Sequence, residues 1–253
     1  MRPDGADYPG CAGFCRDCGR EHRLPPGDAV ACCQELMARL DREGRIDFTR
    51  SRTGAEPRFS TAPLFGPERG KMFGVLVCRR PDGSRTVLRA FSGQYGGTWE
   101  VEGWVGPLFS ARRFAAVSRA TEERIKALGR RIDTLAAGSG ARRDLVRRRR
   151  ALSRALMREL HRLYCPVNFR GEQRTLARAF LEPGIPTGAG DCCAPKLLNH
   201  AARHNLLPLG LAEFYWGREN RSRSRQHGHF YPPCSGKCRP LLGFLLCGLE
   251  ERI

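Results

Sequence analysis

Two cysteine clusters near the C-terminal end carry the strongest chemical signal in this sequence. Residues 188–196 read Gly-Ala-Gly-Asp-Cys-Cys-Ala-Pro-Lys, and residues 231–238 read Tyr-Pro-Pro-Cys-Ser-Gly-Lys-Cys. Each stretch has the pattern of a helix start, where the positive end of the helix dipole lowers the pKa of a nearby thiol. Thiolates are good ligands for Zn²⁺. We therefore expect a zinc site at which up to four sulfurs converge, those of Cys192, Cys193, Cys234 and Cys238.

A strand is predicted between the two clusters. Residues 207–217 are short, apolar and aromatic, and Pro and Gly bound them. The element order is then helix, strand, helix. The pattern does not say which of Cys192 and Cys193 binds the metal. Glu213 interrupts the apolar strand, and a buried carboxylate is costly unless it is paired or functional. Glu213 is therefore a candidate general base or ligand, with an exposed position or a structural ion pair as the alternative.

Two histidines and an aspartate near the clusters could move protons. His227 and His229 lie in the segment that leads into Cys234, so an imidazole could serve as a ligand or a proton carrier. The alternative is a surface loop with incidental histidines. Asp191 directly precedes Cys192 and is the other candidate. The sequence thus offers Glu213, Asp191 and His227 as candidate catalytic residues.

A second cysteine-rich region lies at the N-terminal end. Cys15 and Cys18 form a Cys-x-x-Cys-Gly knuckle, the usual half of a small zinc ribbon. Cys32 and Cys33 are candidates for the other half, although they lack the usual spacing, and His22 or Cys11 could replace them. The alternative is that Cys32 and Cys33 simply pack on a helix predicted over residues 28–43.

Composition restricts the class of protein. The chain has 253 residues, of which 41% are hydrophobic and 28% charged, which is typical of a globular protein with one or two domains. It lacks an apolar run of about 18 residues and an N-terminal apolar leader, so we expect a cytoplasmic protein without a membrane span. Twelve cysteines in a reducing compartment favour zinc binding over disulfides.

The charge balance favours a polyanionic partner. Lys and Arg number 44 against 26 acidic residues, a net charge of +18. Residues 111–165 have the pattern of a helical hairpin whose second arm is rich in arginine. Such a run is often only a solvated face, but a rigid basic arm can also contact the phosphates of RNA. The candidate RNA-binding residues are Arg142, Arg143, Arg147, Arg148, Arg149, Arg150 and Arg154.

A strand hairpin is predicted earlier in the chain. Residues 71–80 and 85–93 are two apolar runs joined by Pro-Asp-Gly-Ser. The first run is apolar on both faces, which is typical of a central strand. Residues 99–104 suggest a further strand.

These elements carry a first resemblance. The two cysteine clusters, the strand between them, and residues 70–77 and 90–93 resemble the N-terminal extension of some long bacterial rRNA and tRNA pseudouridine synthases. The resemblance covers roughly residues 60–250. The chain ends at Ile253, where the synthase catalytic domain would begin, so we expect a stand-alone form of the extension without pseudouridine synthase activity. The resemblance implies a link to RNA modification.

The element order carries a second resemblance. A strand hairpin, a helix opening with Cys, a strand, and a helix opening with Pro-Cys are together similar to the zinc nucleobase deaminases. In that superfamily the first helix supplies His or Cys with a catalytic Glu two residues later, and the second supplies Pro-Cys-x-x-Cys. Here Ala194 lies two residues after Cys192, and three residues separate Cys234 from Cys238. The general acid/base is thus absent from the position that the resemblance implies.

The expected fold is α/β: a small mixed sheet of cytidine-deaminase-like type with a basic helical hairpin inserted at about 111–165. We expect a Cys-rich segment over residues 1–45 and the deaminase-like domain over residues 60–253. The function that these features favour is zinc-stabilised binding of tRNA or rRNA in support of RNA modification. The alternatives are a zinc-dependent nucleobase or nucleotide deaminase, and a structural partner that docks a separate RNA-modifying enzyme.

Overall fold

A three-stranded antiparallel sheet forms the centre of the protein. The computed structural model describes residues 8–49, 54 and 56–252. Strand β3 (Lys71–Arg79) lies between β4 (Arg85–Phe91) and β5 (Leu207–Trp216) and pairs antiparallel with both. Strands β1 (Cys11–Cys15) and β2 (Arg20–Leu24) form a separate antiparallel hairpin.

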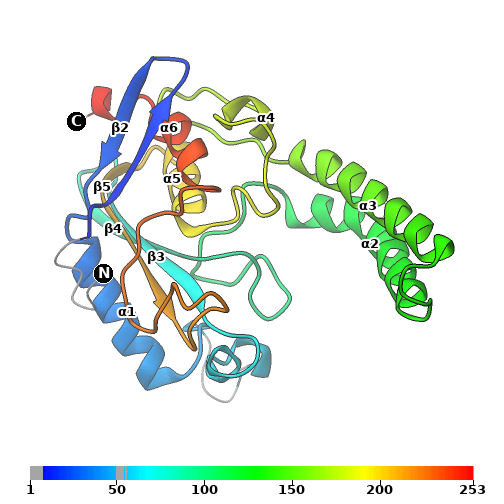
Figure 1. Ribbon diagram of the computed structural model, residues 1–253. Helices are drawn as coiled ribbons and strands as arrows, with labels where there is room; N and C mark the ends of the chain where they lie inside the picture. The colour runs from blue at the N-terminus through cyan, green and yellow to red at the C-terminus, as the bar shows by residue number, and fades with distance from the viewer. Residues whose placement is uncertain (1–7, 50–53, 55, 253) are drawn as a thin grey trace.

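Helices cover the sheet and extend from it (Figure 1). In chain order they are α1 (Ala29–Glu43), α2 (Ala111–Asp133), α3 (Gly140–His161), α4 (Leu176–Ala179), α5 (Cys193–Arg203) and α6 (Arg239–Leu246), with 3-10 turns at Pro57–Phe59, Ala62–Phe65 and Glu250–Arg252. Among the described helices, none combines the length and the apolar character that crossing a membrane requires.

The sheet buries both of its faces. Side chains alternate along β3, so Leu76 and Cys78 enter one core with α5 and α6, whereas Val75 and Val77 enter another with α1. The run Phe73 to Cys78 is completely buried, which confirms the prediction of a central strand.

Most of the expected elements are confirmed, and two details are wrong. The sheet is antiparallel rather than mixed, because β4 and β5 run parallel to each other but lie on opposite sides of β3 and never pair. Residues 99–104 form no strand. Their aromatic residues belong to the core instead: the Trp104 ring packs on Phe73, and its Nε1 donates a hydrogen bond to the Ile46 carbonyl at 2.8 Å.

The N-terminal hairpin packs directly on α6 through glycines. A Cβ on Gly243 would lie 1.9 Å from the Phe14 carbonyl oxygen, and one on Gly13 would lie 2.3 Å from the Gly243 nitrogen. Such distances allow no side chain. The backbones of β1 and α6 therefore touch, as the neighbouring ribbons in Figure 1 indicate.

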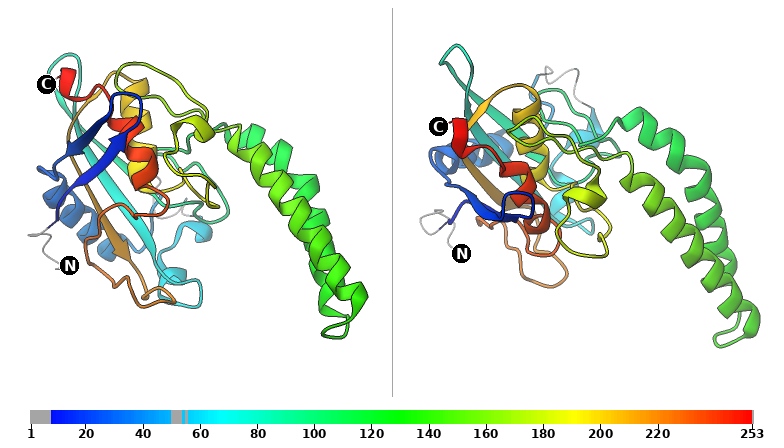
Figure 2. Two further views of the ribbon diagram at one scale, coloured as in Figure 1. Left: turned by 45° about the horizontal axis from the view of Figure 1, so that its top comes forward. Right: turned by 90° about the horizontal axis from the view of Figure 1, so that it is seen from above.

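Helices α2 and α3 form an antiparallel arm that projects from the body (Figure 2). Each begins at a serine whose side chain accepts a backbone N–H of the first turn, Ser110 from Arg113 and Ser139 from Arg142. A narrow apolar seam buries Leu128 and Ile132 of α2 and Leu156 and Leu160 of α3. The predicted helical hairpin is thus confirmed.

The contact between β1 and α6 yields a stability prediction. Replacing Gly243 with Ala should lower the free energy of unfolding by about 1–3 kcal/mol, because the added methyl group would overpack two backbones. Gly140→Ala is the matched control, since the nearest atom to a Cβ on Gly140 would lie 4.0 Å away. Denaturant unfolding measures both variants. Equal stability of the two would show that the contact is not tight in solution.

Candidate metal centres

The N-terminal ends of α5 and α6 meet and bring three cysteines together. Cys192 is the residue before α5, Cys238 is the residue before α6, and Cys234 lies one turn earlier. The turn is closed by the Cys238 N–H, which donates to the Cys234 carbonyl at 3.2 Å. All three sulfurs lie within 4.8 Å of one another, and those of Cys234 and Cys238 are 3.5 Å apart. We call this group the three-cysteine centre.

The spacing of these sulfurs suits a zinc ion. Tetrahedral Zn–S bonds of about 2.3 Å place ligand sulfurs about 3.8 Å apart. Three protein ligands leave the fourth position of a tetrahedral ion open, which is the arrangement of catalytic rather than structural zinc sites. Of the two adjacent cysteines, Cys192 and not Cys193 belongs to this centre, because the Cys192 sulfur is the one that lies near those of Cys234 and Cys238.

The thiols of the three-cysteine centre stabilise one another's charge states. Hydrogen bonding with Cys192 and Cys238 lowers the pKa of Cys234 far below the usual value for a thiol. Hydrogen bonding with Cys234 raises the pKa of Cys192, and hydrogen bonding with both partners raises the pKa of Cys238. Among the three thiols, the lowered pKa expected for a ligand at a helix start is therefore found at Cys234 in the metal-free state. Metal binding must displace the protons of the other two thiols.

Glu213 lies beside this centre, on the face of β5 that α5 covers. Its Oε1 accepts a hydrogen bond from the Ala194 N–H at 2.6 Å. The side chain is only 3% exposed, and burial raises the pKa of Glu213 to about 8. This carboxyl group can therefore hold a proton at neutral pH and exchange it, as a general acid/base must.

A glycine on the neighbouring strand makes room for Glu213. Gly74 is paired with Glu213 across β3 and β5. A Cβ on Gly74 would lie 2.6 Å from the Cys193 Cβ and 3.3 Å from the Glu213 Cγ. Only glycine lets the start of α5 lie this close to the sheet.

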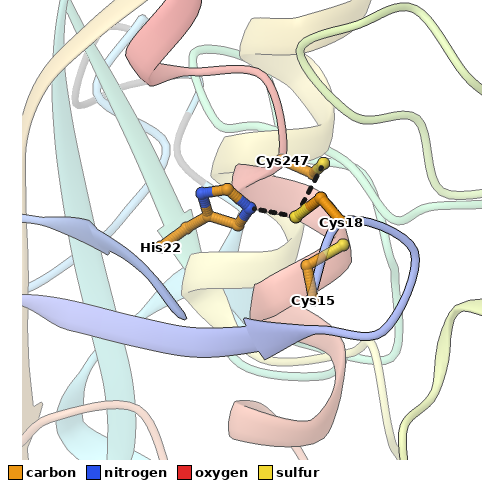
Figure 3. Close-up of side chains that lie close together, drawn as sticks. All are labelled: Cys15, Cys18, His22 and Cys247. Atoms are coloured by element: carbon orange, nitrogen blue, oxygen red, sulfur yellow. Dashed lines mark hydrogen bonds between the residues drawn. The ribbon is translucent and has the colours of Figure 1, made fainter. Parts of the chain in front are cut away.

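A second group of ligands joins the two ends of the chain (Figure 3). It contains Cys15 at the end of β1, Cys18 in the turn, His22 in β2 and Cys247 directly after α6, with all ligand atoms within 4.8 Å of one another. The Cys18 sulfur lies 3.0 Å from the His22 Nε2 and 3.8 Å from the Cys247 sulfur. We call this group the four-ligand centre.

The four-ligand centre fits a structural zinc site. Three sulfurs and one imidazole complete a tetrahedron without an open position. Although burial opposes ionisation, hydrogen bonds from the Arg20 backbone and from the Cys15 and Cys247 thiols lower the pKa of Cys18. His22 is buried, and its Nδ1 lies 3.8 Å from a carboxylate oxygen of Glu250. A carboxylate on this side of the ring would orient a metal-bound imidazole.

The ligand set differs from the one expected at the N-terminal end. Cys15 and Cys18 are joined by His22, which was an alternative, and by Cys247, which was missed because it stands alone after an apolar helix. Cys32 and Cys33 lie on α1 and belong to neither centre. The Cys33 sulfur donates to the Ala212 carbonyl at 3.5 Å, as expected for a packed helix cysteine.

Three other candidate residues have structural contacts. Cys193 is fully buried, and its sulfur donates to the Met72 carbonyl at 3.4 Å. The His227 ring packs on Trp216, and its Nδ1 accepts from the Gly217 N–H at 3.1 Å; it is not part of the three-cysteine centre. Asp191 accepts a hydrogen bond from Tyr164 at 2.7 Å, which ties the end of the α2–α3 arm to the start of α5.

The arginines of α3 divide into three sets. Those spaced three or four residues apart share one exposed face: Arg143, Arg147, Arg150, Arg154 and Arg158. Arg142 and Arg149 are half-buried, and Arg149 lies against Gly129 of α2. Arg148 is exposed on a different side. We call the first set the arginine stripe; it includes Arg158, which the sequence prediction had left out of the candidate RNA-binding residues.

Comparison with protein-family models, curated proteins and solved structures finds no match to this chain.

The two centres predict two zinc ions per chain. Cys192→Ala should remove one ion, whereas Cys193→Ala should remove none, because only the Cys192 sulfur faces the other ligands. Cys247→Ala should release the other ion and lower the melting temperature, since the binding free energy of a structural metal contributes to folding. Elemental analysis of purified protein under reducing conditions measures these counts. Loss of metal from Cys193→Ala with retention in Cys192→Ala would reverse the assignment.

Proposed function

We propose that the protein is a zinc-dependent hydrolase of the nucleobase deaminase type. The observation that carries this proposal is the position of the Glu213 carboxylate on the Ala194 N–H. Ala194 lies two residues after Cys192, where zinc deaminases carry their catalytic Glu. In this proposal, the carboxylate that is absent at position 194 comes instead from Glu213 on β5, which contacts the Ala194 backbone.

The order of elements supports the same proposal. The hairpin β3–β4 is followed by α5 with Cys192 at its start, by β5, and by α6 with Cys234 and Cys238 at its start. This is the order that the resemblance to zinc deaminases implies. The two departures are the origin of the carboxylate and the three residues between Cys234 and Cys238.

The groups present match the chemical demands of hydrolytic deamination. Water adds to the ring carbon that carries an amino group, the C–N bond breaks, and the products are the carbonyl base and ammonia. Cys192, Cys234 and Cys238 would hold the zinc ion, which would act as a Lewis acid and make water nucleophilic at neutral pH. In its ionised form, Glu213 would take one proton from the water at Oε2 and deliver it to the departing nitrogen, and the second proton of the water would end on the ring nitrogen of the product. The Oε1 of Glu213 meanwhile stays on the Ala194 N–H.

We further propose that the substrate base belongs to RNA held by the α2–α3 arm. The arginine stripe runs from Arg143 to Arg158 of α3, about 22 Å at the rise of an α-helix. Its guanidinium groups face solvent on a helix that projects from the body (Figure 2). Such a row suits a phosphate backbone, and the net charge of +18 favours the same partner. The resemblance to the extension of pseudouridine synthases agrees with tRNA or rRNA.

The catalytic proposal predicts a specific loss of activity. Glu213→Gln should reduce ammonia release by about 10²- to 10⁴-fold, because the amide cannot carry the proton. Glu100→Gln, which alters an exposed carboxylate, is the matched control. Ammonia release is measured with cytidine, adenosine, tRNA and single-stranded RNA. Turnover in Glu213→Gln equal to that of the wild type would rule out the assigned role, provided that zinc content is unchanged.

The RNA proposal predicts a weaker dependence of affinity on salt. Replacing Arg143, Arg147, Arg150 and Arg154 with Gln should reduce the slope of log affinity against log salt by about 3, because each lost phosphate contact releases fewer counterions. The control replaces four exposed arginines of the body and removes the same charge: Arg42, Arg79, Arg80 and Arg221. Filter binding to tRNA measures both slopes. Equal slopes would make the stripe an ordinary solvated face.

A further inference from the structure

A cavity of about 480 Å³ opens beside the three-cysteine centre. The Cys234 residue is part of its wall, together with the start of α6, the loop before it and the edge of β1. The volume is within the range of small-molecule sites in proteins. A ligand in this cavity would therefore lie against a metal ligand of the proposed catalytic site.

Three arginines line the same cavity. Arg23 is paired with Glu21, also in the wall, at 3.1 Å, so these two charges cancel. Arg225 is half-buried, and its guanidinium lies 4.2 Å from the centre of the Tyr231 ring, which fixes its position. Arg239 is exposed in the first turn of α6, where the helix dipole also favours an anion. The remaining charge of the wall is thus positive, from Arg225 and Arg239.

Arg225 is also close enough to the buried Glu213 for its charge to act on that carboxyl group. Arg225 thus belongs to the cavity wall and also acts on the candidate acid/base. A guanidinium group binds phosphate oxygens in a bidentate manner. Two such groups beside one metal centre match the phosphate of a nucleotide whose base is the reacting group.

We propose that this cavity binds a phosphate of the nucleotide whose base reaches the three-cysteine centre, with Arg225 and Arg239 as its ligands. The proposal rests on the proposed deaminase function for the identity of the base. The same phosphate chemistry occurs in a free nucleoside monophosphate and in the phosphodiester of an RNA strand. The recognition of phosphate, however, is a property of the cavity alone.

Calorimetric binding tests the proposal with zinc-loaded protein and four probes: cytidine, adenosine, and the 5′-monophosphates of both. The wild type should bind at least one monophosphate about tenfold or more tightly than its nucleoside, as expected for charged hydrogen bonds. The double variant Arg225→Gln, Arg239→Gln should lose this difference while keeping its zinc. The control Arg79→Gln, Arg221→Gln removes two exposed charges elsewhere and should keep it.

A short single-stranded RNA distinguishes the two sources of phosphate. If the monophosphates bind no better than the nucleosides but RNA affinity falls in the Arg225/Arg239 variant and not in the control, the cavity recognises a phosphodiester. If neither ligand depends on these arginines, the proposal is wrong. Arg225→Lys retains the charge, so preserved affinity in that variant excludes a folding defect as the cause of the loss.

The outcome is separable from that of the catalytic proposal. Ammonia release together with nucleotide and RNA binding that does not depend on Arg225 and Arg239 would overturn the phosphate site and leave the deaminase proposal standing. Phosphate-dependent binding without ammonia release from any probe would support the phosphate site and overturn the deaminase proposal.

Discussion

The backbone contact between β1 and α6 governs where the metal ligands lie. Because Gly13 and Gly243 carry no side chain, the hairpin can rest directly on the helix. This contact brings Cys15 and Cys18 to the C-terminal end of α6, where Cys247 follows. The other end of the same helix presents Cys238 to Cys192. A larger residue at either glycine would separate the hairpin from the helix and part Cys247 from the three ligands that the hairpin carries.

A buried carboxyl group is the second constraint. Glu213 occupies an otherwise apolar strand, and the hydrogen bond from Ala194 only partly offsets its loss of hydration. The three-cysteine centre adds negative charge nearby, since the Cys234 charge also raises the pKa of Glu213. A purely structural core would gain stability from an apolar residue here.

The sequence predicted those site residues whose positions depend on near neighbours in the chain, and missed those that depend on tertiary packing. Cys192, Cys234 and Cys238 could be found because helix starts and strand patterns depend on near neighbours. Cys247 could not, because it joins Cys15 and Cys18 only through the packing of α6 on β1. The contact of Glu213 with Ala194 likewise depends on Gly74 and on the register of β3 and β5. Residues 99–104 were misread because buried aromatic residues in a loop have the composition of a strand.

Helix α6 has eight residues, about 12 Å at the rise of an α-helix, with one candidate metal centre at each end. A helix this short has little stability of its own, so its ends cannot order independently. Occupation of either centre therefore lowers the entropy that remains to be lost at the other, which makes the two binding equilibria cooperative. Thermodynamic linkage requires this effect to be reciprocal. A chelator that strips metal from the four-ligand centre would thus weaken metal binding at the three-cysteine centre without touching it.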